Sequence, residues 1–327
     1  MRVRPGWVAA SDAPSQVIRA VRVGGALTAG SAAELHGLWL LGDDRLHDLA
    51  PQTASRLRSP HDAAVPLDRR AHRVCVHYRA GAGAGGAGAG AGVGGGRAGA
   101  GGDTGAGAGG GVDAVARAGG HERGGGGRRE RAARPARDGL ITAIAEMFRC
   151  SGAVPAMVAL ESALNRGRLD MPAVEQLRAL SSAWVGRRLD EVSCDSDSGL
   201  ETIARMLMHR LRVVVRAQVR VPGVRRVDLL VGERLVIELD GRSFHSGDDF
   251  DRDRRQDLEL TLRGYLVVRI SYRMVVEEWD ATQRSLRELV TRGLHRAGHP
   301  GRLLPPFGAP NAARGVSDAG NEDASPL

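Results

Sequence analysis

Three carboxylates interrupt an apolar stretch of the chain near residue 230. Asp228, Glu238 and Asp240 lie in or directly after two runs of branched apolar residues, 227–231 and 235–239. A carboxylate buried in such a run costs free energy unless a positive group meets it. A divalent cation would meet two carboxylates at once, and Mg²⁺ prefers oxygen ligands. The pattern therefore predicts a metal-dependent hydrolytic site, with Mg²⁺ as the expected cofactor and Mn²⁺ as the alternative.

The two runs predict a pair of β-strands whose turn length decides whether the acids meet. Side chains alternate along a strand, so a two-residue turn beginning at Gly232 would put Asp228 and Glu238 on opposite faces. A three-residue turn that pairs Leu230 with Arg234 would put both acids on one face. We therefore predict an odd turn length or a bulge, which the conformational freedom of Gly232 allows.

Elements on both sides of this hairpin would hold it in a sheet. Their expected ranges are a helix over 198–209, a strand over 213–221, a charged helix over 248–263, a strand over 265–270 and a closing helix over 275–295. The resulting order is α-β-β-β-α-β-α. We predict an α/β fold for residues 192–299, with a mixed sheet flanked by helices.

The motifs of this unit resemble those of the very-short-patch-repair-like endonucleases and, more narrowly, the family designated domain of unknown function 559. The resemblance is carried by segments 227–229, 237–241, 253–257 and 264–269, and by His245. It implies a restriction-endonuclease-like core of the PD-(D/E)xK type. It also implies a metal-dependent DNA endonuclease that resembles very-short-patch-repair nicking enzymes.

The resemblance implies a metal-binding role for three positions of the hairpin. Asp228 matches the central metal ligand of the family, and Glu238 matches its acidic partner. The backbone carbonyl of Leu239 would be the third ligand.

Three further residues would complete the catalytic set. Asp240 stands where mismatch-nicking relatives have a histidine, His245 matches their second active-site histidine, and Glu201 matches an acid on the first helix. Asp240 also stands at the lysine position of the wider motif, and the chain contains no lysine. Because an imidazole titrates near neutral pH, His245 is the residue expected to act as a base.

Each of these three residues also has a local explanation. Glu201 follows Ser198 at the spacing of a capping box at a helix N-terminus. Asp240 precedes Gly241 in a pair that is typical of a turn. His245 has the alternative of being an ordinary loop histidine.

The charge of the chain indicates an anionic partner. The formal net charge is +8, and all 46 basic residues are arginines. Phosphate contacts would use this charge, so DNA is the expected partner and RNA the less favoured one. Arg242, Arg254 and Arg255 are the expected nucleic-acid contacts. The alternative function is a non-catalytic nucleic-acid-binding or toxin–antitoxin-type regulatory protein that retains the nuclease fold.

The rest of the chain divides into four regions. Residues 1–78 predict a small α-rich part with a helix over 31–41, in which Ser31 and Glu34 have the spacing of a capping box. Segment 31–41 also resembles part of an antitoxin-like N-terminal region of actinobacterial relatives. Residues 79–137 are rich in Gly, Ala and Arg and predict a disordered linker. Residues 138–191 predict a helical segment, and residues 300–327 predict a disordered tail.

The cysteines and histidines show no motif in the sequence. The three cysteines, Cys75, Cys150 and Cys194, form no Cys-x-x-Cys pair and are expected to be unreactive thiols. Four histidines lack the spacing of metal ligands: His36, His47, His72 and His77.

The sequence shows no signal peptide and no apolar run that is long enough to span a bilayer. We therefore expect a bacterial cytoplasmic protein, with association with the nucleoid as an alternative, and no membrane partner. The sequence does not indicate an oligomeric state.

Overall fold

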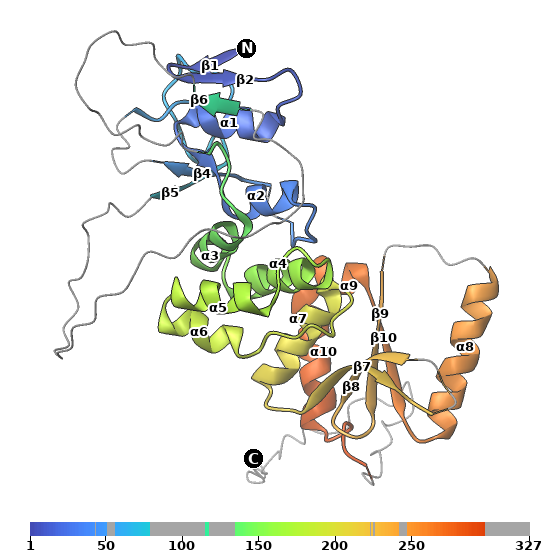
Figure 1. Cartoon of the computed structure of the whole chain (residues 1–327). Helices are drawn as coiled ribbons and strands as arrows, with labels where there is room; N and C mark the ends of the chain where they lie inside the picture. Colours follow the sequence, from blue (N-terminus) through green and yellow to red (C-terminus); the bar gives the residue numbers. More distant parts are fainter. Residues whose placement is uncertain are drawn as a thin grey trace, which may run out of the picture.

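The computed structural model describes most of the chain outside the Gly/Ala tract and the C-terminal tail. The described residues are 1–42, 44–50, 56–78, 115–117, 135–222, 224, 226–241 and 247–297. Figure 1 shows that they form an N-terminal part, a central group of helices and a C-terminal part around a sheet.

The N-terminal part contains two small sheets and two helices, so the prediction that it is α-rich is wrong. Its elements are β1 (Arg2–Arg4), β2 (Trp7–Ala9), α1 (Ser15–Val23), β3 (Ala26–Leu27), α2 (Ala29–Leu35), β4 (Leu46–Ala50), β5 (Val74–Tyr78) and β6 (Val115–Arg117). The sheets have the strand orders β1-β2-β6 and β3-β4-β5, and β4 and β5 run parallel. Val17, Ala20 and Val21 of α1 are buried, and their three- and four-residue spacing forms the apolar face of this helix.

The central part of the described chain is helical. It consists of α3 (Leu140–Cys150), α4 (Ala153–Asn165), α5 (Met171–Ala179) and α6 (Ala183–Leu189). Asp170 caps α5 by accepting a hydrogen bond from the Ala173 amide. Ala33 of α2 and Ile144 of α3 belong to one apolar core, so this core crosses from the N-terminal part into the helices.

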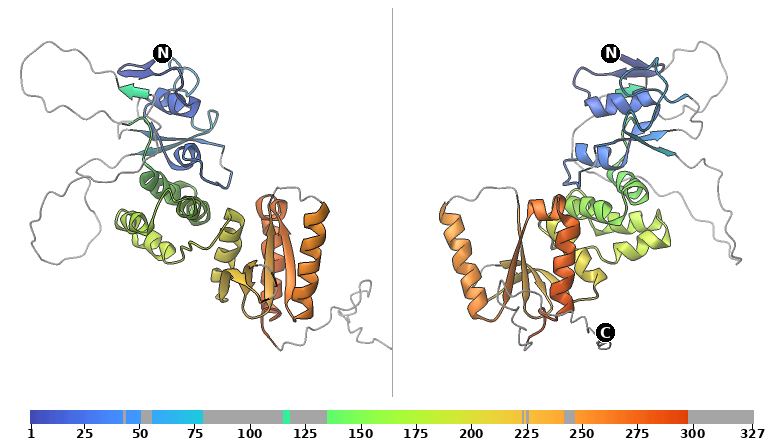
Figure 2. Two further views of the ribbon diagram at one scale, coloured as in Figure 1. Left: turned by 45° about the vertical axis from the view of Figure 1, so that its right-hand side comes forward. Right: turned by 180° about the vertical axis from the view of Figure 1, so that it is seen from behind.

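The C-terminal part has an α/β fold. Its elements are α7 (Gly199–Arg210), β7 (Val215–Arg220), β8 (Arg226–Val231), β9 (Leu235–Asp240), α8 (Gly247–Leu262), β10 (Leu266–Ser271), α9 (Tyr272–Val276) and α10 (Trp279–Thr291). The strand order is β10-β9-β8-β7, with β9 and β10 parallel and the other pairs antiparallel. The sheet lies between α8 on one side and α7 with α10 on the other (Figures 1 and 2). The predicted mixed sheet with flanking helices is confirmed.

Two predicted helices differ from the structure. The closing helix is divided into α9 and α10, and the Thr282 hydroxyl bridges the break by donating to the carbonyl of Met274 at 2.7 Å. The helix expected over 31–41 begins at Ala29 and ends at Leu35. Ser31 therefore lies inside α2, where its hydroxyl bonds to the next segment of chain instead of capping the helix.

Part of the predicted linker is structured. Within residues 79–137, β6 pairs with β2. Ala136 is fully buried, and its carbonyl accepts a hydrogen bond of 2.8 Å from the Leu27 amide. Ala136 belongs to the N-terminal apolar core, so ordered structure begins before the predicted boundary at 138.

None of the helices in the described part of the chain combines the length and the apolar character that crossing a membrane requires.

Candidate functional site

The hairpin between β8 and β9 has a three-residue turn. Val231 pairs with Leu235, which leaves residues 232–234 in the turn. Gly232 has a φ of +61°, in the left-handed region that glycine adopts without steric cost. The predicted odd turn length is confirmed.

The predicted pairing of Leu230 with Arg234 is wrong, because Leu230 pairs with Val236. The reason lies outside the hairpin. The amides of Glu233 and Arg234 both donate to the carbonyl of His295, at 2.9 and 3.2 Å. The C-terminal segment thus holds the turn, which lies one residue further along the chain than predicted, so the partner of Leu230 is two residues further along.

This register places one polar residue from each strand in a single row across the sheet. The pairs on either side of Gln218 place it opposite Asp228. The β8–β9 ladder ends at the pair of Leu229 with Ile237, and extending its register by one position puts Asp228 opposite Glu238. Glu238 in turn pairs with Arg269 of β10. Residues directly opposite each other on regular adjacent strands share a face, so Asp228, Glu238 and Arg269 lie on one face, and Gln218 lies beside Asp228 at the same level of the sheet. We call these four residues the polar row.

The backbone is irregular at the start of the polar row. Gln218 has a φ of +54°, which is uncommon for a residue with a side chain. Ala217 packs into the core that contains α7, whereas Val219 packs into the core that contains Leu260 of α8. The strand therefore changes face at Gln218. This turns its side chain toward α7, where its amide donates to Glu201 Oε2 at 2.6 Å.

The two central acids of the polar row have different surroundings. Asp228 Oδ2 accepts a hydrogen bond of 2.8 Å from the amide of Leu239. Glu238 Oε1 is buried and has no hydrogen-bond partner among the described residues. A buried carboxylate oxygen without a partner is costly, and a cation is one means of compensating it.

Burial raises the pKa values of these acids. The pKa of Glu238 is raised to about 8, first by burial and then by the negative charge of Asp228. Burial and the charge of Asp240 raise the pKa of Asp228, although the Leu239 hydrogen bond opposes this effect. A bound positive charge would stabilise the ionised forms of both carboxylates, which otherwise repel each other.

Glu201 has the local contacts that its position in the sequence predicts. Its amide donates to Ser198 Oγ at 3.3 Å, and that hydroxyl donates to Glu201 Oε1 at 3.0 Å. The Asp197 amide also donates to Oε2. Burial nevertheless raises the pKa of Glu201 to about 7. Ser198 therefore caps the helix, the Glu201 carboxylate bonds back to the capping segment, and Gln218 links the same carboxylate to the polar row.

Asp240 is engaged by an arginine. Arg269 Nη2 lies 2.6 Å from Asp240 Oδ1, and the same guanidinium contacts Asp253 at 3.3 Å and Asp257 at 3.2 Å. These acids, Asp240 first, raise the pKa of Arg269 further above its ordinary value. The structure thus brings Asp240 near the polar row but pairs it with a cation of the protein itself.

The remaining predicted residues lie at the edge of this site or outside the described chain. Arg254 and Arg255 are exposed on α8, and Arg254 lies 3.6 Å from Asp257. Arg242 and His245 fall outside the described residues.

Gln218 and Arg269 were missed by sequence reasoning. Arg269 is a charged residue within an otherwise apolar strand, 265–270, which is the signal that identified the acids of the hairpin. That signal would have found Arg269 but not Gln218, because the strand over 213–221 also contains Arg216 and Arg220.

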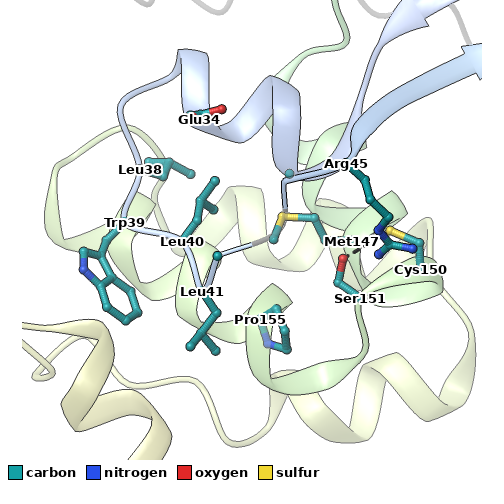
Figure 3. Close-up of a pocket in the computed structure, with 12 residues that line it drawn as sticks. Glu34, Leu38, Trp39, Leu40, Leu41, Arg45, Met147, Cys150, Ser151 and Pro155 are labelled. Atoms are coloured by element: carbon teal, nitrogen blue, oxygen red, sulfur yellow. Dashed lines mark hydrogen bonds between the residues drawn. The ribbon is translucent and has the colours of Figure 1, made fainter. Parts of the chain in front are cut away.

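A cavity of about 610 Å³ lies away from the polar row. Its wall includes Leu38 and Leu41 from the segment after α2, and Pro155 at the start of α4 (Figure 3). Arg45 and Cys150 lie at one end of it. The cavity contains none of the predicted site residues.

Comparisons with known proteins give little support to the family resemblance. No protein-family model and no curated protein match the chain. Among solved structures, the catalytic domain of the homing endonuclease I-Bth0305I is similar at 22% identity and a TM-score of 0.25. The similar region covers 28% of this chain and 94% of that domain. A TM-score this low does not support a functional assignment, so any assignment depends on the geometry of the polar row.

Proposed function

We propose that the C-terminal part is a metal-dependent DNA endonuclease with a restriction-endonuclease-like core of the PD-(D/E)xK type. One observation carries the proposal: the register of β8 and β9, extended by one position, puts Asp228 opposite Glu238, and one buried oxygen of Glu238 has no hydrogen-bond partner in the described part of the chain. Two acids in this relation suit a hard divalent cation better than they suit a protein core.

The residues present fit Mg²⁺, with Mn²⁺ as a substitute. Asp228, Glu238 and the backbone carbonyl of Leu239 would hold the ion. When bound, the ion supplies positive charge for a phosphodiester and lowers the pKa of a bound water.

The protein's own residues have separate parts in this proposal. Gln218 orients Glu201 through its amide and lies opposite Asp228 in the polar row. Arg269 places a fixed positive charge beside Glu238 and holds Asp240. An arginine stays protonated and cannot serve as a base, so His245 remains the proposed base.

DNA is the proposed substrate because the chain carries a net charge of +8. Arg254 and Arg255 are exposed on α8, the helix whose Asp253 and Asp257 contact Arg269 of the polar row. Together with Arg242 they are the proposed phosphate contacts. Losing one such contact should weaken binding to all sequences alike and reduce its salt dependence.

A cleavage assay tests the proposal. The full-length protein is incubated with duplex, nicked, mismatched and single-stranded DNA, and with RNA, in Mg²⁺ or Mn²⁺. We expect a DNA substrate to be cleaved, and we expect Asp228→Asn to lower the rate by about 100-fold or more. Glu288→Gln, an isosteric change at an exposed acid of α10, is the matched control. Cleavage that persists in Asp228→Asn would show a contaminating nuclease.

The pairing of Asp240 with Arg269 favours the second candidate, a DNA-binding protein that keeps the fold without the catalysis. The wider motif has a lysine at the position of Asp240, and here that position is occupied by an acid already neutralised by the protein. Salt-sensitive DNA binding, with no cleavage and no heat of Mg²⁺ binding in calorimetry, would establish this second function.

A further inference from the structure

A second group of potential metal ligands lies in the N-terminal half of the molecule, far along the chain from the hairpin. It contains two histidines and two cysteines whose ligand atoms all lie within 4.8 Å of one another. We call it the Cys2His2 cluster. Its members are His47, Cys75, His77 and Cys150.

Three elements bring these residues together. His47 on β4 is the register partner of Cys75 on the parallel strand β5. His77 follows Cys75 by two positions, so both side chains point to the same face of the sheet. Cys150 is the last residue of α3 and approaches this face, with its sulfur 3.6 Å from His47 Nδ1.

Three of the six distances between ligand atoms in the cluster match the edges of a tetrahedron around zinc, and all six are within 4.8 Å. Bonds of about 2.1 Å to nitrogen and 2.3 Å to sulfur give ligand edges of about 3.4 Å for N···N and 3.6 Å for S···N. His47 Nδ1 lies 3.3 Å from His77 Nε2. The Cys75 sulfur lies 3.6 Å from the same nitrogen of His77. Ordinary apolar packing gives no reason for these four ligand atoms to converge at these separations.

The surroundings hold at least one ligand in the orientation that a metal needs. His77 Nδ1 contacts Glu146 Oε2 at 2.8 Å, which leaves Nε2 directed into the cluster. Glu146 is buried and is itself paired with Arg149 at 2.7 Å. A carboxylate behind a histidine commonly fixes the ring of a metal ligand in this way. Glu146 and Cys150 are four residues apart, so one face of α3 supplies both.

We propose that four side chains bind one structural Zn²⁺ ion: His47, Cys75, His77 and Cys150. Two thiolates and two imidazoles form a donor set that selects Zn²⁺ over hard cations such as Mg²⁺. Four protein ligands complete the tetrahedron, so the site is structural and not catalytic. The ion would tie β4 and β5 to α3, joining segments that lie 103 residues apart in the chain.

The zinc content of the purified full-length protein tests this proposal. Protein produced in zinc-supplemented medium and kept in reducing buffer should contain about one zinc per chain by mass spectrometry of the metal. The variants Cys75→Ser and Cys150→Ser should lose the bound zinc. Cys194→Ser is the matched control, because Cys194 is exposed and outside the cluster, and it should keep the zinc.

A cobalt titration of the wild-type chain covers the case in which the cysteine variants fail to fold. Co²⁺ in a tetrahedral site with thiolates should produce strong visible absorption at about one equivalent, and Zn²⁺ should abolish it. Three results would overturn the proposal: no bound zinc after reconstitution, zinc that survives both cysteine substitutions, or a Cys75–Cys150 disulfide in fresh protein. None of these results depends on DNA cleavage, so the zinc site and the proposed nuclease can fail separately.

Discussion

At the scale of single residues, the C-terminal part carries acids in places that weaken the fold. Glu238 and Glu201 are mostly buried, and burial is the largest cause of their raised pKa values. Glu238 also has an oxygen without a partner among the described residues. A protein under selection for stability alone would replace such groups, so their presence is an argument for function.

The first prediction is that Glu238→Gln stabilises the Mg²⁺-free protein while it abolishes cleavage. The amide keeps the shape of the side chain and removes a charge that both burial and Asp228 disfavour. We expect a gain on the order of 1 kcal/mol at pH 8 in urea unfolding, together with a loss of cleavage of about 100-fold or more. Glu288→Gln should change neither quantity. A destabilised Glu238→Gln protein would mean that the carboxylate has a partner within the fold.

The second prediction concerns pH. The folded, Mg²⁺-free protein holds protons on Glu238 and Glu201, whose pKa values are raised to about 8 and about 7. The unfolded chain releases them near pH 4.5, so the folded state binds more protons over this window. This contribution to stability is complete below about pH 4.5 and is lost as the pH rises to about 8.

The measurement is the urea midpoint at intervals from pH 5 to pH 8.5. Because other groups titrate too, the useful quantity is the difference between wild type and Glu238→Gln, which should grow as the pH rises. Adding Mg²⁺ should flatten the wild-type curve, because the ion favours the charged carboxylate. Parallel curves for the two proteins would contradict the raised pKa of Glu238.

At the scale of elements, the hairpin shows how much the sequence determines. Alternation of apolar and polar residues was enough to predict both strands and the need for an odd turn. The register could not be predicted, because the turn amides bond to His295, which lies about 60 residues further along the chain. Only Asp228 and Glu238 of the polar row were predicted. Gln218 joins the row through a backbone conformation with positive φ, which no local sequence pattern indicates.

The third prediction is that Gly232→Ala is more destabilising than another glycine substitution at positive φ. A Cβ at Gly232 would lie 2.4 Å from the carbonyl oxygen of His295, in a conformation with φ of +61°. Gly264 has a φ of +88° but nothing within 4 Å, so Gly264→Ala isolates the conformational cost. We expect about 1 kcal/mol for Gly264→Ala and roughly 2–4 kcal/mol for Gly232→Ala in thermal unfolding. Equal losses would mean that the C-terminal segment does not hold the turn.

At the scale of the whole molecule, the fold brings together functional groups from segments that are far apart in the sequence. The Cys2His2 cluster has no motif in the sequence because its ligands come from separate elements, and two of its members lie 103 residues apart. A sequence pattern reports neighbours along the chain, whereas these ligands become neighbours only when β4, β5 and α3 have packed. Buried charged side chains also join the central helices to the C-terminal part, and no pattern in the sequence indicates that they pair.

Glu161 of α4 and Arg205 of α7 form that buried connection. Their side chains are 1% and 4% exposed and contact each other directly. Glu161 also accepts hydrogen bonds from the Thr202 hydroxyl and the Ser193 amide. Arg205 donates to the carbonyl of Glu191 at 2.7 Å. Because both charged groups have several hydrogen-bond partners, the ion pair fixes the position of α4 relative to α7.

The fourth prediction is that removing one partner of this buried ion pair destabilises the protein more than replacing both partners by apolar residues. Glu161→Leu leaves the Arg205 charge buried without its carboxylate and should cost about 3–5 kcal/mol. Arg205→Met should cost a similar amount for the reverse reason. The double variant buries no unpaired charge, so its loss should be smaller than the sum of the single losses by several kcal/mol.

Urea unfolding of the wild type, the two single variants and the double variant measures this coupling energy. A control cycle on the exposed pair Arg292 and Glu288 should give roughly 0.5 kcal/mol. A coupling for the buried pair as small as the control would show that α4 and α7 are held together by their apolar contacts alone.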